Sequence, residues 1–203
     1  KSYNMKIITY IESSSNNIHP VSLESLVAAQ KLKKETNGEI HAITFHKNLY
    51  DTLKKFDIDN VICIDNSELK NYNPLYYLEA LNQINIQINP NVFIFGHTYE
   101  TRDWVARLSA KLDIPFISDC ISLHYTNNLH LIRPIYQAKL SQELEITSNK
   151  FIVSFQAGTF SIDDLEQGQA KLNEIPIDLS SVKNTIKPGE KFQESSGGVD
   201  LTA

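Results

Sequence analysis

Residues Val92–Ile121, VFIFGHTYETRDWVARLSAKLDIPFISDCI, carry the pattern that decides the fold. The run VFIF is apolar at every position, as is typical of a strand covered on both faces. Gly96 then turns the chain into a segment whose apolar residues recur at helical spacing: Trp104, Val105, Leu108 and Leu112. Pro115 precedes a second β-rich run, Phe116–Ile121. A strand, a helix and a strand in this order predict one crossover unit of a parallel sheet.

The same alternation extends toward the N-terminus. Three further strands are expected: Met5–Ile11, Ile40–Phe45 and Val61–Ile64. The helices between them begin near Pro20 and Pro74, because proline is tolerated in the first helical turn, where its missing N–H has no partner. A short helix carries Leu49, Leu53 and Phe56, and Gly38 is a plausible stop for the first helix. The sequence therefore predicts an α/β fold with a mostly parallel sheet and helices on both faces.

The rhythm changes after Leu123. Four β-like runs follow one another: His124–Thr126, Leu129–Ile135, Leu140–Ile146 and Phe151–Phe155. Asn127-Asn128 is a signal for a two-residue hairpin turn between the first two runs. We expect all of these runs to form an antiparallel extension on one edge of the sheet. Residues Ile175–Leu179 are expected to add one more edge strand.

Length and composition favour one domain followed by a linker. The chain has 203 residues, and domains commonly span about 100–200. We assign residues 1–186 to the domain and residues 187–203 to a linker that leads into a further, missing domain. Lys187–Gly198 is polar and lacks apolar periodicity, so we expect it to be a mobile tether. No apolar stretch approaches the roughly 20 residues that a membrane-spanning helix needs.

Charge and cysteine content narrow the classes of partner. The net charge is −5, whereas nucleic-acid binders concentrate Lys and Arg to neutralise phosphates. The basic cluster Lys31, Lys33 and Lys34 is best explained as a solvated helix face, so no nucleic-acid partner is expected. Cys63 and Cys120 each lie in an apolar run, which favours buried free thiols over a disulfide scaffold.

Motifs that hold phosphate are missing. The chain has seven glycines, and none of them forms GxGxxG or GxxxxGK. The loop after the first strand, Glu12–Asn17, is rich in Ser and Asn instead. Ser196–Leu201, SGGVDL, resembles the SGGxDS loop of ATP pyrophosphatases, but it has Leu in place of the last Ser and lies at the wrong end of the chain. We interpret that stretch as linker.

The histidines do not converge by local spacing. His41 and His46 lie five residues apart on a strand, which places them on opposite faces. With Asn127-Asn128 as the turn, His124 and His130 also point to opposite sides of the hairpin, which argues against a two-histidine metal site. His97 follows a strand end, where α/β proteins often bind ligands, so it is the histidine to examine. No catalytic, cofactor-binding or metal residue is therefore assigned.

Three arginines lie beside expected strand ends: Arg102, Arg107 and Arg133. Their guanidinium groups could hold an anion or the carboxylates of a partner, because Arg binds such groups through two parallel hydrogen bonds. The alternative is ordinary ion pairing on an exposed helix face.

Residues 96–160 resemble the N-terminal domain of the electron transfer flavoprotein alpha subunit. The resemblance is carried by Gly96-His97-Thr98, Arg102-Asp103, Arg107–Leu112, Ser118-Asp119, Arg133–Tyr136 (RPIY) and Phe160. Residues 197–201 then resemble the stretch that precedes the family's FAD-binding domain. The chain departs from the family at Ala138, where a glycine is expected, and at Gln156-Ala157, where Arg-Pro is expected. These departures are compatible with a divergent, FixB-type member.

The resemblance implies that different domains and subunits hold the cofactors and form the scaffold. FAD would be held by the subunit's C-terminal domain and not by this segment, and AMP would be held by the partner beta subunit. This domain would have an adenine-nucleotide-hydrolase-like fold that serves as a scaffold for the heterodimer. Electrons would pass from dehydrogenases to a quinone reductase or another acceptor, in the bacterial cytoplasm or the mitochondrial matrix. The rival hypotheses are a nucleotide-dependent transferase or pyrophosphatase and a nucleotide sensor of the universal-stress type.

The hairpin after Leu123 is also the expected partner surface. Exposed strand edges invite association, so they must be covered or paired. We expect the hairpin that carries Arg133 and Tyr136 to lie at or beside the interface with the beta subunit. Arg133 could instead be an internal strut that holds the hairpin in place.

Overall fold

The computed structural model describes residues 4–14, 17–187 and 189. The strands are β1 (Lys6–Tyr10), β2 (Ser13–Ser14), β3 (Asn17–Ile18), β4 (Glu39–Thr44), β5 (Asn60–Cys63), β6 (Val92–Gly96), β7 (Phe116–Cys120), β8 (Ser122–Tyr125), β9 (Leu129–Ile135), β10 (Leu140–Ile146), β11 (Phe151–Phe155) and β12 (Lys171–Glu174). The α-helices are α1 (Pro20–Thr36), α2 (Tyr50–Leu53), α3 (Pro74–Ile88) and α4 (Tyr99–Leu112). Short 3-10 turns are η1 (Lys47–Leu49), η2 (Ser67–Leu69) and η3 (Ile162–Asp164).

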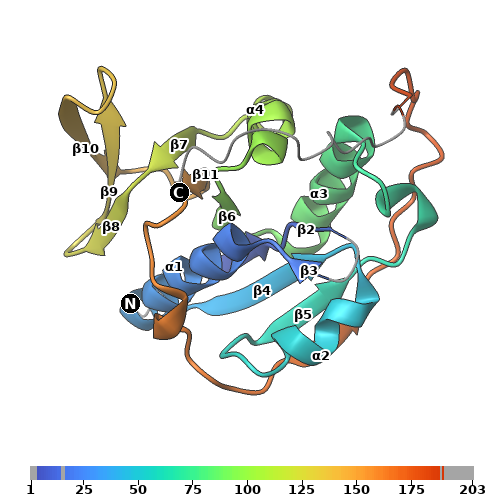
Figure 1. Ribbon diagram of the computed structural model, residues 1–203, viewed down its shortest axis with the longest axis horizontal. Helices are drawn as coiled ribbons and strands as arrows, with labels where there is room; N and C mark the ends of the chain where they lie inside the picture. Colours follow the sequence, from blue (N-terminus) through green and yellow to red (C-terminus); the bar gives the residue numbers. More distant parts are fainter. Residues whose placement is uncertain (1–3, 15–16, 188, 190–203) are drawn as a thin grey trace, which may run out of the picture.

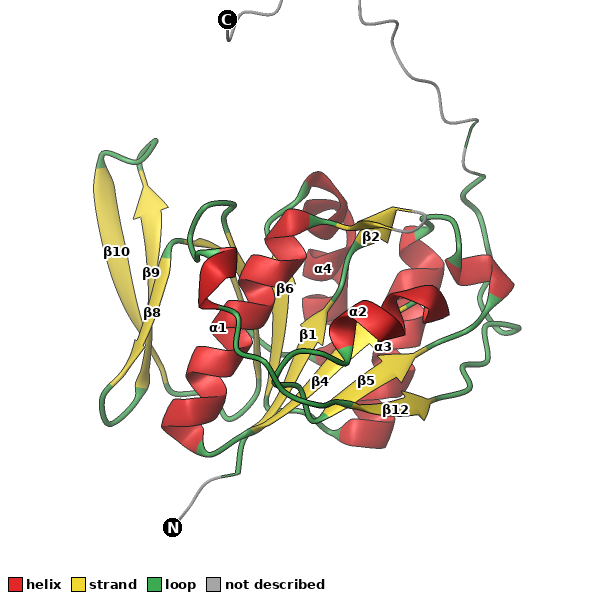
Figure 2. Ribbon diagram, turned by 60° about the horizontal axis from the view of Figure 1, so that its bottom comes forward, coloured by secondary structure: helices red, strands yellow, loops and turns green. Residues whose placement is uncertain are grey.

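Seven strands form one parallel sheet in the order β12-β5-β4-β1-β6-β11-β7. The N-terminal half of the chain winds from β1 toward β5, and the next strand, β6, returns to the other side of β1 (Figure 2). The strand order therefore reverses between β1 and β6. In open α/β sheets, ligands bind outside the carboxyl ends of the strands at such a point.

Helices cover both faces of this sheet, as the sequence predicts. The apolar side chains of α1 and α2 pack on one face, and those of α3 and α4 pack on the other. The second face is aromatic: Trp104 of α4 lies edge-on to Tyr10 and Phe95, with ring centroids 5.8 and 5.5 Å apart. Such edge-to-face pairs add about 0.5–1.5 kcal/mol each beyond the burial of their area.

Polar residues cap both ends of the long helices. Asn73 accepts the amide hydrogens of Leu75 and Tyr76 at the start of α3, and the hydroxyl of Thr98 accepts that of Thr101 at the start of α4. Helix α1 ends on Asn37, which adopts the left-handed conformation with φ 52°. Gly38 is therefore not the left-handed residue that ends this helix.

Gly38 is required for a different reason. A Cβ at this position would lie 2.7 Å from the carbonyl oxygen of Met5, so the chain passes too closely for any side chain. Strand β4 begins directly after Gly38, and its pairing with β1 starts at Glu39 opposite Lys6.

The antiparallel extension forms at the edge of the sheet that ends on β7. Strands β8, β9 and β10 make a separate three-stranded sheet in the order β10-β9-β8, which stands away from the main sheet in Figure 1. The amide of Ile121 donates to the carbonyl of Ile132 over 2.8 Å, so the link to β7 is continuous.

Two assignments of strands were wrong. Phe151–Phe155 is not part of the antiparallel set: β11 lies between β6 and β7 in the parallel sheet, and all five of its residues are buried. Its continuous apolar run, FIVSF, is typical of such a central strand. The further edge strand is β12, which precedes the expected Ile175–Leu179 and pairs in parallel with β5.

Both cysteines are free and buried, as predicted. Burial raises the pKa of the Cys63 thiol to about 11 and that of Cys120 to about 12, so both remain protonated and unreactive at neutral pH. No helix among the described residues is long and apolar enough to cross a membrane. The expected tether, Lys187–Gly198, lies almost entirely outside the described residues, and so does Ser196–Leu201.

Candidate functional site

The point where the strand order reverses is occupied by His97, directly after β6. The Nδ1 of its ring lies 2.9 Å from the hydroxyl of Ser154 in β11, and its Nε2 lies 3.3 Å from a carboxylate oxygen of Asp119 in β7. Three neighbouring strands thus deliver a serine, a histidine and an aspartate to one place, which sequence spacing alone did not suggest.

This arrangement is not a nucleophilic triad. Ser154 is completely buried, and its hydroxyl oxygen accepts the amide hydrogen of Asp119 over 3.2 Å. A serine nucleophile must expose its oxygen to a substrate carbonyl. The three side chains instead tie the ends of β6, β7 and β11 together.

The electrostatics of the site keep His97 neutral. Burial lowers the pKa of this imidazole, the positive charges of Arg102 and Arg133 lower it further, and Asp119 opposes them. A neutral ring can donate one hydrogen and accept one, which suits a link between a carboxylate and a hydroxyl.

A groove of about 430 Å³ opens beside His97. Its walls include Glu12 after β1, Thr98 and Glu100 at the start of α4, and Ala157 after β11. The hydroxyl of Thr98 donates to Glu12, and Glu100 accepts a hydrogen bond from Tyr10 over 3.1 Å. Two carboxylates therefore line this groove, together with the cation of Arg102.

The start of α1 has no amide hydrogens left for an anion. Pro20 carries none, the amide of Val21 donates to the ring of His19 over 3.3 Å, and the amide of Ser22 donates to the carbonyl of His19 over 2.9 Å. Phosphate sites at helix N-termini depend on free amide hydrogens. The start of α1 therefore lacks this feature of a phosphate site.

Close packing of α1 on β6 narrows the site further. A Cβ on Gly96 would lie 2.6 Å from a methyl carbon of Val21. The glycine that the sequence marks as a turn thus lets the first turn of α1 rest directly on the end of β6.

The three-stranded sheet presents two different faces to its surroundings. Leu129 and Leu131 of β9 are buried against the α/β body, and Arg133 follows on the same face by the strand's alternation. The charge of Arg133 lowers the pKa of Cys120 and of His97. No acceptor among the described residues reaches its buried Nε.

Tyr136 occupies the tip of the next hairpin and is 74% exposed. It is the first of three consecutive residues with positive φ, of 51°, 57° and 62°, the others being Gln137 and Ala138. Nearby Leu140 is 57% exposed. The structure therefore separates the two residues assigned to the partner surface, with Arg133 turned toward the body and Tyr136 turned away from it.

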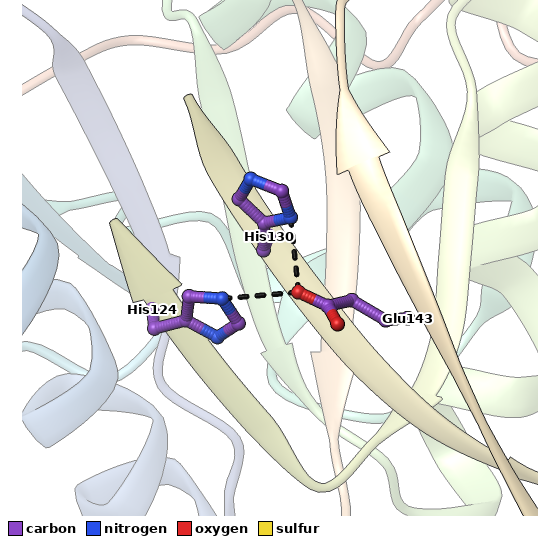
Figure 3. A group of neighbouring side chains, drawn as sticks. All are labelled: His124, His130 and Glu143. Atoms are coloured by element: carbon purple, nitrogen blue, oxygen red, sulfur yellow. Dashed lines mark ion pairs between the residues drawn. The ribbon is translucent and has the colours of Figure 1, made fainter. Parts of the chain in front are cut away.

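The prediction that His124 and His130 point to opposite sides of the hairpin was wrong. These residues pair directly across β8 and β9, and their rings are stacked with centroids 4.9 Å apart (Figure 3). The loop has three residues, Thr126–Asn128, because Tyr125 pairs with Leu129 rather than with His130. A shift of one residue in register moves a side chain to the other face of the ribbon. His124 and His130 are six positions apart in the sequence. Two residues can pair directly across a hairpin with a three-residue loop only when their separation is even, so this spacing was the available signal.

The remaining candidates have structural explanations. His41 is buried in β4, whereas His46 lies beyond the end of that strand. Lys31 and Lys34 of α1 are exposed and form ion pairs with Asp164 and Glu166, which agrees with a solvated helix face. The side chain of Lys33 is only 20% exposed and pairs with Asp57 and Asp59 at 2.9 and 3.0 Å.

The fold and groove define a class of protein: a parallel α/β domain with helices on both faces of its sheet and a polar groove where the strand order reverses. The model of the electron transfer flavoprotein domain matches residues 7–180. The chain therefore belongs to the electron transfer flavoprotein family.

Curated relatives agree with this membership. The electron transfer flavoprotein subunit alpha of Bacillus subtilis is 23% identical over 202 residues, which cover 97% of this chain and 61% of that protein. Its counterpart in Syntrophomonas wolfei is 25% identical over 75% of this chain and 48% of its own length. The lactate dehydrogenase (NAD(+),ferredoxin) subunit LctC of Acetobacterium woodii is 26% identical over 73% of this chain and 37% of its own length. The chain thus spans roughly a third to three-fifths of these relatives.

Proposed function

We propose that this chain is the scaffold part of an electron transfer flavoprotein alpha subunit. The observation that carries the proposal is the match of the family model to residues 7–180, and the lack of free amide hydrogens at the start of α1 agrees with it. The domain contributes surfaces and rigidity, while a flavin held elsewhere in the longer subunit carries the electrons. This division favours a carrier over a nucleotide-dependent enzyme or sensor.

FAD belongs to a domain outside these 203 residues in this proposal, and AMP belongs to the beta subunit. The longer relatives support this division, because 39% of the length of the Bacillus subtilis subunit (100% less the 61% covered) has no counterpart here. Dehydrogenases donate the electrons, and a quinone reductase or another acceptor receives them.

The cofactor assignment is tested by titrating the purified chain with FAD and following flavin fluorescence. We expect no saturable quenching at micromolar FAD, since the proposal places the flavin in the part of the longer subunit that has no counterpart here. Stoichiometric binding would contradict the placement of the flavin outside this segment.

The beta subunit is the partner in this proposal, and β10 lies in its interface. Strand β10 is the outer edge of the small sheet, with five of its seven residues exposed. Such an edge needs a cover, and aromatic side chains are favoured anchors at interfaces. Tyr136 and Leu140 supply apolar surface at its tip. Arg133 lies on the body-facing side of β9, so in this proposal it supports the hairpin from within.

Replacement of Tyr136 by Ala tests the anchor. We expect the affinity for the beta subunit to fall by more than about 1 kcal/mol, or about fivefold. Ile86→Ala is the matched control, because Ile86 is 71% exposed on α3. Unchanged affinity in Tyr136→Ala, with an earlier thermal unfolding of the free chain, would assign Tyr136 to the fold instead.

A further inference from the structure

Three metal-ligating side chains converge on the outer face of the small sheet. His124 lies on β8, His130 lies directly opposite it on β9, and Glu143 lies on β10 opposite Ile132. Glu143 is therefore the diagonal neighbour of His130 on the same face. Each strand of the sheet contributes one of the three residues.

The donor atoms of these side chains point at one another (Figure 3). One carboxylate oxygen of Glu143 lies 3.1 Å from Nε2 of His124 and 3.1 Å from Nδ1 of His130. The three donor atoms all lie within 4.8 Å of one another. The two imidazole planes differ by 7°, so both rings turn a nitrogen toward the same side.

These separations are close to those around a tetrahedral zinc ion. Bonds of about 2.0–2.1 Å at tetrahedral angles place neighbouring donors about 3.3 Å apart. Both contacts of Glu143 already have this spacing, and the two ring nitrogens need only a small rotation to reach it. The side chains can make that rotation, since they are 42%, 22% and 54% exposed for His124, His130 and Glu143.

We propose that His124, His130 and Glu143 bind one divalent transition-metal ion of the Zn²⁺ type. Two imidazoles and a carboxylate are a donor set that suits zinc, and they leave a fourth position for water. The inner face of the same strands holds the ligands in register, because Leu129 and Leu131 are buried against the body. The bound ion links all three strands of the small sheet.

An ion pair alone accounts poorly for this geometry. Exposed pairs contribute about 0–1 kcal/mol, and holding three side chains in one place costs conformational entropy. A metal ion compensates for that cost with three bonds, and it relieves the crowding of two rings around one oxygen.

The test is calorimetric titration of the chelator-treated chain with Zn²⁺, followed by Co²⁺ spectroscopy. We expect one equivalent to bind and the tetrahedral Co²⁺ absorption bands to appear. His124→Ala, His130→Ala and Glu143→Gln should each weaken binding at least about tenfold. Glu145→Gln is the matched control on the same strand and face, and it should change the affinity by less than about threefold.

The thermal unfolding temperature provides a second readout. Zn²⁺ should raise it in the wild-type chain and in Glu145→Gln, because a ligand that binds only the folded state stabilises it. His130→Gln keeps a polar side chain of similar size should the alanine variant fail to fold. Equal affinity in wild type and His130→Gln, or the absence of a one-equivalent site, would overturn the assignment.

Discussion

The α/β body and the three-stranded sheet differ in how many faces of their strands are buried. In the body, helices cover both faces of the sheet at its inner strands, β5, β4, β1, β6 and β11. The apolar run VFIF of β6 is buried throughout. The small sheet buries one face and leaves the other exposed, with charged and imidazole side chains along it. The body therefore determines stability, whereas the small sheet offers surface for ligands and partners.

The largest expected effect lies in the body. Phe93→Ala empties the space of a completely buried ring between β6 and the aromatic helix layer, which should cost about 3–5 kcal/mol of unfolding free energy. Urea denaturation measures the loss. Leu140→Ala in the small sheet is the comparison, and it should stay within about 0.5 kcal/mol because Leu140 is exposed. Similar losses at both sites would contradict the contrast between the two regions.

Gly96→Ala probes the contact between α1 and β6. The added Cβ would meet a methyl carbon of Val21 at 2.6 Å, so we expect a loss of about 1–3 kcal/mol. The double variant Gly96→Ala with Val21→Ala should recover part of that loss, because it removes the carbon that collides. No recovery in the double variant would show that the strain has another origin.

Acid should destabilise the body through its buried histidines. Burial lowers the pKa of His41, and Lys6 lowers it further, while Glu39 and Asp59 oppose the shift. The unfolded chain then binds the proton more readily, so the free energy of unfolding is undiminished above about pH 6.5 and falls below it. The loss levels off once the pH is below the lowered pKa of the folded state.

The measurement is unfolding free energy from pH 8 to pH 5. One such proton contributes a slope of at most about 1.4 kcal/mol per pH unit. We expect His41→Gln to have a shallower slope than the wild type in this range. An unchanged slope would mean that His41 is not protonated differently on unfolding.

The smallest expected effect is a gain in the small sheet. Ala138 has φ of 62°, a conformation that a glycine adopts without the steric cost of a Cβ. Ala138→Gly should therefore raise the unfolding free energy by up to about 1 kcal/mol. Ala106→Gly in the middle of α4 is the matched control with the opposite sign, a loss of about 1 kcal/mol. A loss in both variants would refute strain at the hairpin tip.

The crossover units of the body could be predicted from the sequence because their signals are local. Apolar spacing in α4, Asn73 before Pro74 and the apolar run of β6 each act within a few residues. The motifs that indicate the family lie in the same stretch, and the match over residues 7–180 agrees with them. Position 97 was singled out for the same local reason, since it follows a strand end.

Only the tertiary structure decided which segments meet. Phe151–Phe155 has the composition of a strand, but its insertion between β6 and β7 depends on residues that lie at least 30 positions away in the sequence. His124 and His130 share a face because the loop holds three residues rather than two. A strand's composition determines that it will be buried, whereas its partners and register depend on the sum of contacts across the sheet.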